Sequence, residues 1–195
     1  FGLKGASVVL YRNRALRRRM YFSTTTWPGG LYASPTLAGS RSGGITAATW
    51  ASMMSLGEEG YLDVARRIMK AADTIKAGAA EIPEIQIIGK PTFCIAMKSD
   101  AVDIFHVNDH LAAKGWRLNG LQLPPGVHFC MTLPQAAPGV AERFVTDLRE
   151  AVAYAKNPPQ PMPQSGAMYG GGGMQLDRDM IRDMMLLWLD ETYEP

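Results

Sequence analysis

A stretch of small residues at positions 33–44 constrains the fold of this chain more than any other feature. Its sequence is Ala-Ser-Pro-Thr-Leu-Ala-Gly-Ser-Arg-Ser-Gly-Gly, in which glycines and serines surround one cation, Arg41. Glycine permits positive φ angles and lets another group approach the backbone closely. Serine hydroxyls, free backbone N–H groups and a guanidinium can all donate hydrogen bonds to an anion. The stretch therefore has the composition of an anion-binding loop.

The residues that follow predict that this loop lies at the N-terminus of a helix. Residues 45–56 are rich in Ala and Met, which is typical of a buried helix. The free N–H groups and the dipole at a helix N-terminus favour a phosphate. An ordinary glycine-rich turn into a core helix has the same composition. On this pattern alone, both interpretations stay open.

The remaining pattern predicts an α/β protein. Helical periodicity and β-branched runs alternate along the chain, which favours helices covering a mostly antiparallel sheet. Strands are expected at 6–12, 20–26, 85–88, 93–97, 116–119 and 127–133. Helices are expected at 45–56, 61–80, 102–113, 137–156 and 177–191, with a proline-rich linker at 157–164 and a glycine-rich loop at 165–173.

Charge and cysteine usage argue against several function classes. The chain has 20 Lys and Arg against 18 Asp and Glu, so nothing suggests nucleic-acid binding. No apolar run approaches the ~20 residues of a membrane span, and a soluble cytoplasmic protein is expected. Cys94 and Cys130 lie in apolar runs and are expected to be reduced core residues. His106, His110 and His128 have no acidic partners at metal-ligand spacing, so no metal site is expected.

Several longer sequence words accompany the loop. They are Thr-Trp-Pro-Gly-Gly at 26–30, Tyr-Ala-Ser-Pro-Thr at 32–36, Ala-Ala-Lys-Gly-Trp at 112–116, Leu-Gln-Leu-Pro-Pro at 121–125 and His-Phe-Cys at 128–130. Together with Gly-Ser-Arg at 39–41 and Gly-Gly at 43–44, they resemble the sphingosine-1-phosphate lyase family. This family belongs to the pyridoxal-phosphate-dependent group II decarboxylase superfamily. The resemblance extends from Phe1 to about Tyr193.

The resemblance implies a fold class and a domain organisation. The fold would be the α/β fold type I of pyridoxal-phosphate-dependent transferases. Residues 1–57 would be the C-terminal part of the cofactor-binding large domain, with a dimer-interface loop. Residues 58–156 would form a small C-terminal α/β domain, and 157–195 a Pro/Gly-rich linker and terminal helix. The chain would be the C-terminal portion of a longer enzyme, whose Schiff-base lysine is expected just before Phe1.

The resemblance also implies an activity. Enzymes of this family are aldehyde lyases that cleave phosphorylated long-chain bases such as sphingosine 1-phosphate into a long-chain aldehyde and phosphoethanolamine. Pyridoxal 5'-phosphate acts as the electron sink for this retro-aldol cleavage. Amino-acid decarboxylation of the glutamate or aromatic type is the alternative within the superfamily. A third hypothesis is that the chain by itself is a non-catalytic oligomerisation and phosphate-binding module.

Site residues follow from the same resemblance. Gly39 and Ser40 would donate to a phosphate, of the cofactor or the substrate, in the partner subunit's active site of a homodimer with shared sites. Lys4 is expected as a cation near the substrate phosphate, while the roles of Schiff-base lysine and plain surface lysine stay open. Arg41 would contact the substrate or hold the loop by pairing with a carboxylate. Ser34 is a weaker companion, because Ser-Pro-Thr is equally a turn signal.

Overall fold

The structure, a computed structural model, describes residues 2–166 and 177–193. It divides into two compact units, residues 1–62 and 63–195. This boundary lies a few residues beyond the division expected after residue 57, and the three-part domain organisation stays a prediction. Most of the glycine-rich loop expected at 165–173 lies outside the described residues.

The first unit contains a short helix, a hairpin and the beginning of a long helix. Helix α1 (Arg14–Arg18) is capped by Asn13, whose side chain accepts a hydrogen bond from the Leu16 N–H. Strands β1 (Phe22–Thr24) and β2 (Tyr32–Ser34) pair antiparallel. The turn between them contains Gly30 at φ 112, a conformation that favours glycine. Only the first of these two strands was expected.

The strand expected at 6–12 is absent, and this prediction is wrong. The segment has no regular secondary structure, and residues Val8, Val9 and Leu10 are 71%, 65% and 89% exposed. β-branched residues favour strands because they pack well on a pleated, half-buried surface. Among the described residues, no strand pairs with this segment. The strand propensity of its β-branched residues is therefore not sufficient to form a strand.

Helix α2 (Gly43–Ala80) joins the two predicted helices at 45–56 and 61–80. Its backbone leaves the helical region at Gly57, with φ 63 and ψ 178. A side chain would strain this conformation, so glycine is the suitable residue at this position. The break expected at 57–60 is therefore confirmed as a single non-helical residue.

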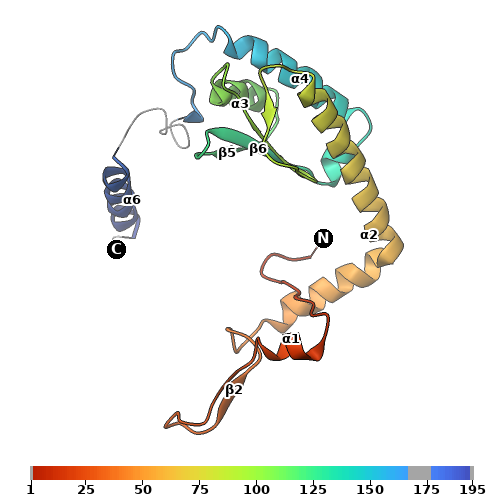
Figure 1. Ribbon diagram of the computed structural model, residues 1–195, viewed down its shortest axis with the longest axis vertical. Helices are drawn as coiled ribbons and strands as arrows, with labels where there is room; N and C mark the ends of the chain where they lie inside the picture. The colour runs from red at the N-terminus through yellow and green to blue at the C-terminus, as the bar shows by residue number, and fades with distance from the viewer. Residues whose placement is uncertain (1, 167–176, 194–195) are drawn as a thin grey trace. The chain divides into compact units, whose positions relative to one another are not determined.

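The second unit is built on a four-stranded sheet (Figure 1). The strands are β3 (Gln86–Ile87), β4 (Cys94–Lys98), β5 (Asn119–Leu121) and β6 (Gly126–Cys130), in the order β3-β4-β6-β5. All neighbours are antiparallel, as expected. The helices are α3 (Ile104–Ala113), α4 (Val140–Ala155) and α6 (Arg178–Tyr193), with a 3₁₀ turn η1 at Leu133–Ala136. The strand predicted at 116–119 begins only at Asn119.

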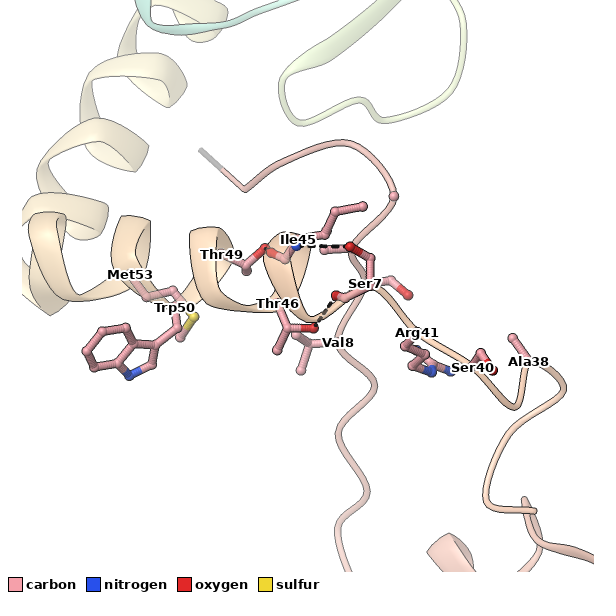
Figure 2. A pocket seen from close by; sticks show the side chains of 13 residues that line it. Ser7, Val8, Ala38, Ser40, Arg41, Ile45, Thr46, Thr49, Trp50 and Met53 are labelled. Carbon is pink, nitrogen blue, oxygen red and sulfur yellow. Dashed lines mark hydrogen bonds between the residues drawn. The ribbon is translucent and has the colours of Figure 1, made fainter. Parts of the chain in front are cut away.

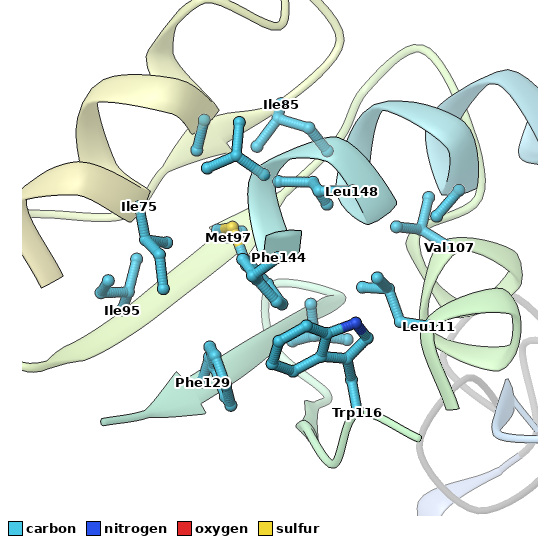
Figure 3. Packing of buried hydrophobic residues seen from close by; sticks show 14 of the residues in the cluster. Ile75, Ile85, Ile95, Met97, Val107, Leu111, Trp116, Phe129, Phe144 and Leu148 are labelled. Carbon is cyan, nitrogen blue, oxygen red and sulfur yellow. The ribbon is translucent and has the colours of Figure 1, made fainter. Parts of the chain in front are cut away.

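The core of this unit lies between the sheet and helices α2, α3 and α4 (Figure 3). Ile95 and Met97 from β4 and Phe129 from β6 face apolar residues of α3, α4 and the second half of α2. At its centre the Phe144 ring stacks on Phe129 at 4.7 Å between ring centroids and meets Trp116 edge-on at 5.0 Å. Such aromatic pairs stabilise beyond their buried area.

The two cysteines lie on the opposite face of the same sheet. Ile95 and Phe129 point into the core, so their neighbours Cys94 and Cys130 point away from it, and both cysteines are exposed and free. The prediction that they are core residues is wrong. It treated two short apolar runs as strands buried on both faces, whereas side chains alternate along a strand covered on one face only.

Candidate functional site

The small-residue loop borders a hollow of about 460 Å³ in the first unit (Figure 2). One wall is the irregular segment 5–8, and the other combines the loop with the first turns of α2. The lining residues are Gly5, Ala6, Ser7, Val8, Ala38, Ser40, Arg41, Ser42, Ile45, Thr46, Thr49, Trp50 and Met53. The loop predicted to bind an anion therefore faces a recess at a helix N-terminus.

Ser42 organises this helix N-terminus. Its side-chain oxygen accepts a hydrogen bond from the Ile45 N–H at 3.4 Å, which is the bond of an N-cap residue. Its carbonyl accepts from the Thr46 hydroxyl at 3.2 Å and the Thr46 N–H at 3.3 Å. The N–H groups of Gly43 and Gly44, in the first turn, have no hydrogen-bond acceptor among the described residues. Groups of this kind can bind an anion.

The glycines of the loop leave space. Gly39, Gly43 and Gly44 are not among the glycines with positive φ, so their backbone conformation does not require glycine. A Cβ atom added at Gly39 or Gly43 would meet no described atom within 4 Å. Among residues 2–166 and 177–193, neither backbone conformation nor close packing therefore requires glycine at positions 39 and 43. Their surface is open to a group from outside the described residues.

The charge around the hollow favours an anion. Residues 1–57 contain seven Lys or Arg and no Asp or Glu; the first acidic residue of the chain is Glu58. Arg41 lines the hollow and forms no ion pair with any described residue. The carboxylate that was expected as a possible partner of Arg41 is therefore not found in the part of the chain that the structure describes. An unpaired guanidinium is a strong donor to a phosphate.

The predicted site residues are only partly brought together. Ser40 and Arg41 line the hollow, and Gly39 precedes them in the same loop. Lys4 lies in an exposed turn next to the lining residue Gly5. Ser34 does not line the hollow. Its hydroxyl instead donates a hydrogen bond to the backbone carbonyl of Thr36 at 2.5 Å.

Ser34 and its neighbour instead shape the approach to the loop. The Thr36 hydroxyl donates in turn to the Ala38 carbonyl at 2.7 Å. These two bonds hold the turn that leads from β2 to the loop. Ser34 is nearly buried, at 9% exposure, and lines a separate hollow that also contains Arg18 and Tyr21.

Sequence patterns missed most of the lining residues. Thr46, Thr49, Trp50 and Met53 lie on one side of α2, and helical spacing from Ser42 could have identified this side. Ser7 and its neighbours could not have been found in this way. Their proximity to the loop is a tertiary contact between distant parts of the chain.

The histidines lie outside this hollow. His106 is buried at 5% exposure on α3, and the His110 ring lies 4.7 Å from the Tyr154 ring. His128 on β6 hydrogen-bonds the Asn119 side chain at 3.1 Å. No group of three or more metal-ligating side chains occurs among residues 2–166 and 177–193.

Comparison with known proteins finds that the chain is similar to sphingosine-1-phosphate lyases. No protein-family model matches the chain. It is 47% identical to a sphingosine-1-phosphate lyase of Arabidopsis thaliana and 44% identical to one of Drosophila melanogaster, over 97% and 99% of its length. The matches span 35% and 36% of those two proteins, so the chain covers about a third of the length of these curated relatives.

Solved structures agree with the sequence matches. A sphingosine-1-phosphate lyase of Burkholderia pseudomallei superposes with a TM-score of 0.72 at 45% identity, covering 94% of this chain and 37% of that one. A glutamate decarboxylase of Lactobacillus brevis superposes with a TM-score of 0.53 at 16% identity, covering 72% and 34%. The expected fold class, fold type I of pyridoxal-phosphate-dependent transferases, is confirmed. We find no described helix with the length and apolar character needed to cross a bilayer.

Proposed function

Because the chain corresponds over nearly its whole length to a segment of sphingosine-1-phosphate lyases, we propose that it is part of an enzyme of that activity. The complete enzyme would cleave a phosphorylated long-chain base into a long-chain aldehyde and phosphoethanolamine. One observation in this chain carries the proposal: an acid-free, cation-bearing loop that borders a hollow at the N-terminus of α2. Both the substrate of such a lyase and pyridoxal 5'-phosphate carry a phosphate, which this loop suits.

The donor set fits a phosphate. In this proposal Gly39 and Ser40 contribute the backbone N–H groups and a hydroxyl that hold it. Arg41 adds a planar pair of donors, and Ser34 maintains the shape of the loop through its bond to the Thr36 carbonyl. Lys4 neutralises the phosphate of the substrate and does not anchor the cofactor. When bound, pyridoxal phosphate would withdraw electrons from the bond that breaks.

The open surface of the loop supports a homodimer with shared active sites. The space beside Gly39 and Gly43 is filled by no described atom of this chain. In this proposal a second subunit brings its own active site to the loop, and a phosphate bound there occupies that space. Homodimers with a two-fold axis use the same surface twice, so each loop would complete the other subunit's site.

Product analysis of the complete protein tests the proposed reaction. We expect a long-chain aldehyde and phosphoethanolamine from sphingosine 1-phosphate in the presence of pyridoxal phosphate. Carbon dioxide and an amine from an amino acid, with no aldehyde, would instead support the decarboxylase alternative. Absence of both products from a protein that binds the cofactor would favour a non-catalytic role.

A further inference from the structure

Cys94 on β4 and Cys130 on β6 lie opposite each other on the two adjacent central strands of the sheet. The strand register pairs Cys94 with Cys130 and Ile95 with Phe129. One residue before Cys94, the Phe93 carbonyl accepts a hydrogen bond from the Met131 N–H at 2.9 Å. In an antiparallel ladder, hydrogen-bonded and non-hydrogen-bonded pairs alternate. Cys94 and Cys130 therefore form a non-hydrogen-bonded pair, the kind in which opposite side chains come closest.

This position has the geometry of a disulfide. Cα atoms of a non-hydrogen-bonded pair lie about 4.5 Å apart, within the range of about 4.4–6.8 Å found across disulfides. Both thiols project from the same face of the sheet, and both are exposed. The pKa of the Cys94 thiol is raised, first by partial burial and then by the neighbouring Cys130, to which it hydrogen-bonds. The two sulfur atoms are thus neighbours.

We propose that Cys94 and Cys130 are a reversible oxidation site that forms a disulfide by exchange with a low-molecular-weight disulfide such as glutathione disulfide. One cysteine thiolate attacks a sulfur of glutathione disulfide, forms a mixed disulfide and releases one glutathione thiolate. The second cysteine, after losing its proton, attacks the protein sulfur of this mixed disulfide and releases the second glutathione. The two cysteines lose two electrons and two protons in total, and the oxidant is reduced to two thiols.

The bridge would fix the centre of the sheet. Strands β4 and β6 are the two inner strands, and the chain between the two cysteines contains α3 and β5. A disulfide here would add a covalent link to strands that already pair, with little change in the folded structure. We therefore expect slower amide hydrogen exchange in β4 and β6 after oxidation.

Peptide mapping of the complete protein tests the proposal. The protein is incubated with glutathione disulfide and digested with trypsin without a reductant. Residues 77–98 and 118–143 each form one tryptic peptide with a single cysteine, because Lys90 precedes a proline. We expect these two peptides to be recovered linked, at a mass two hydrogen atoms below their sum, and to separate after dithiothreitol treatment.

Two variants control for unspecific oxidation. Cys94→Ser should abolish the linked species and leave the Cys130 peptide as a mixed disulfide with glutathione. The double variant His128→Cys with Cys130→Ser keeps two thiols on the same face but places them diagonally, about 7–8 Å apart, and should not cross-link. The proposal is overturned if the wild-type peptides stay unlinked, free or glutathionylated, or if the diagonal variant links equally well.

Discussion

Replacing Asp147 on α4 should test how the second unit holds Trp116 in its core. The Asp147 carboxylate accepts hydrogen bonds from the Trp116 indole N–H at 2.8 Å and from the Lys114 ammonium at 2.7 Å. The Arg143 guanidinium lies over the Trp116 ring, 4.6 Å from its centroid. Burial raises the pKa of Asp147, but the bonds from Lys114 and Trp116 lower it by more, so the pKa lies below its usual range.

The size of the effect follows from these contacts. Trp116 is only 5% exposed, so its N–H has little access to water if its acceptor is removed. A buried donor without an acceptor costs about 1–3 kcal/mol. We therefore expect Asp147→Ala to destabilise the unit by about 2–3 kcal/mol. Asp147→Asn keeps an acceptor for the indole and loses only the charge, which should cost about 1 kcal/mol.

The pH dependence separates the charge from the hydrogen bond. Because the pKa of Asp147 is lower in the folded than in the unfolded state, ionised Asp147 stabilises the fold above the unfolded pKa of about 4. This contribution is lost as the pH falls through the lower, folded-state pKa. The stability difference between wild type and Asp147→Asn should therefore shrink below about pH 4, and it should be constant near pH 7.

Amide hydrogen exchange of α4 in the complete protein measures these differences, because it reports local opening in a multidomain protein. At pH 7 the opening free energy should be highest in the wild type, lower in the Asp147→Asn variant and lowest in the Asp147→Ala variant. If the two variants lose the same stability, the indole hydrogen bond does not contribute as the geometry indicates. A wild-type advantage over Asp147→Asn that persists unchanged in acid would contradict the assignment to the ionised carboxylate.

Three further predictions concern other parts of the chain. Gly78→Ala should lower the thermal midpoint of unfolding, because its Cβ would lie 2.5 Å from both Val145 methyl groups. Overpacking costs about 1–3 kcal/mol, against about 1 kcal/mol gained in helix propensity. Ser42→Ala removes the N-cap bond to Ile45 and should cost about 1 kcal/mol, seen as faster exchange in the first turn of α2, whereas Ser42→Asp should restore it. Lys4→Ala in the complete enzyme should lower kcat/KM for the phosphorylated substrate roughly 10- to 150-fold without loss of cofactor absorbance; unchanged kinetics would identify Lys4 as a plain surface lysine.

Local periodicity predicted the helices of the second unit well. The expected helices at 102–113 and 137–156 correspond to α3 and α4, since each has one apolar side at helical spacing. Strands depended on partners that sequence spacing does not reveal. The β-branched segment 6–12 has no strand beside it among the described residues, and β2, in a stretch read as a loop, pairs with β1.

The candidate site shows the same limit. The composition of 39–44 correctly indicated the N-terminus of a helix, and the loop borders a hollow there, while its binding of an anion stays a prediction. Residues 5–8 line the hollow through a tertiary contact with the loop and α2. The spacing of residues along the sequence does not predict such a contact. Cys94 and Cys130 were placed in the core because four or five apolar residues do not show which face of a strand is covered.

A subunit-mixing experiment tests the shared-site account most directly. One variant of the complete enzyme carries Arg41→Ala and Ser40→Ala in the loop, and the other lacks the lysine that anchors the cofactor. Each should be inactive alone. After random exchange about half the dimers are mixed, and each has one site with both an intact lysine and an intact loop, so roughly a quarter of wild-type activity should return. If a tag pull-down proves exchange and no activity returns, each loop serves its own subunit and the account is wrong.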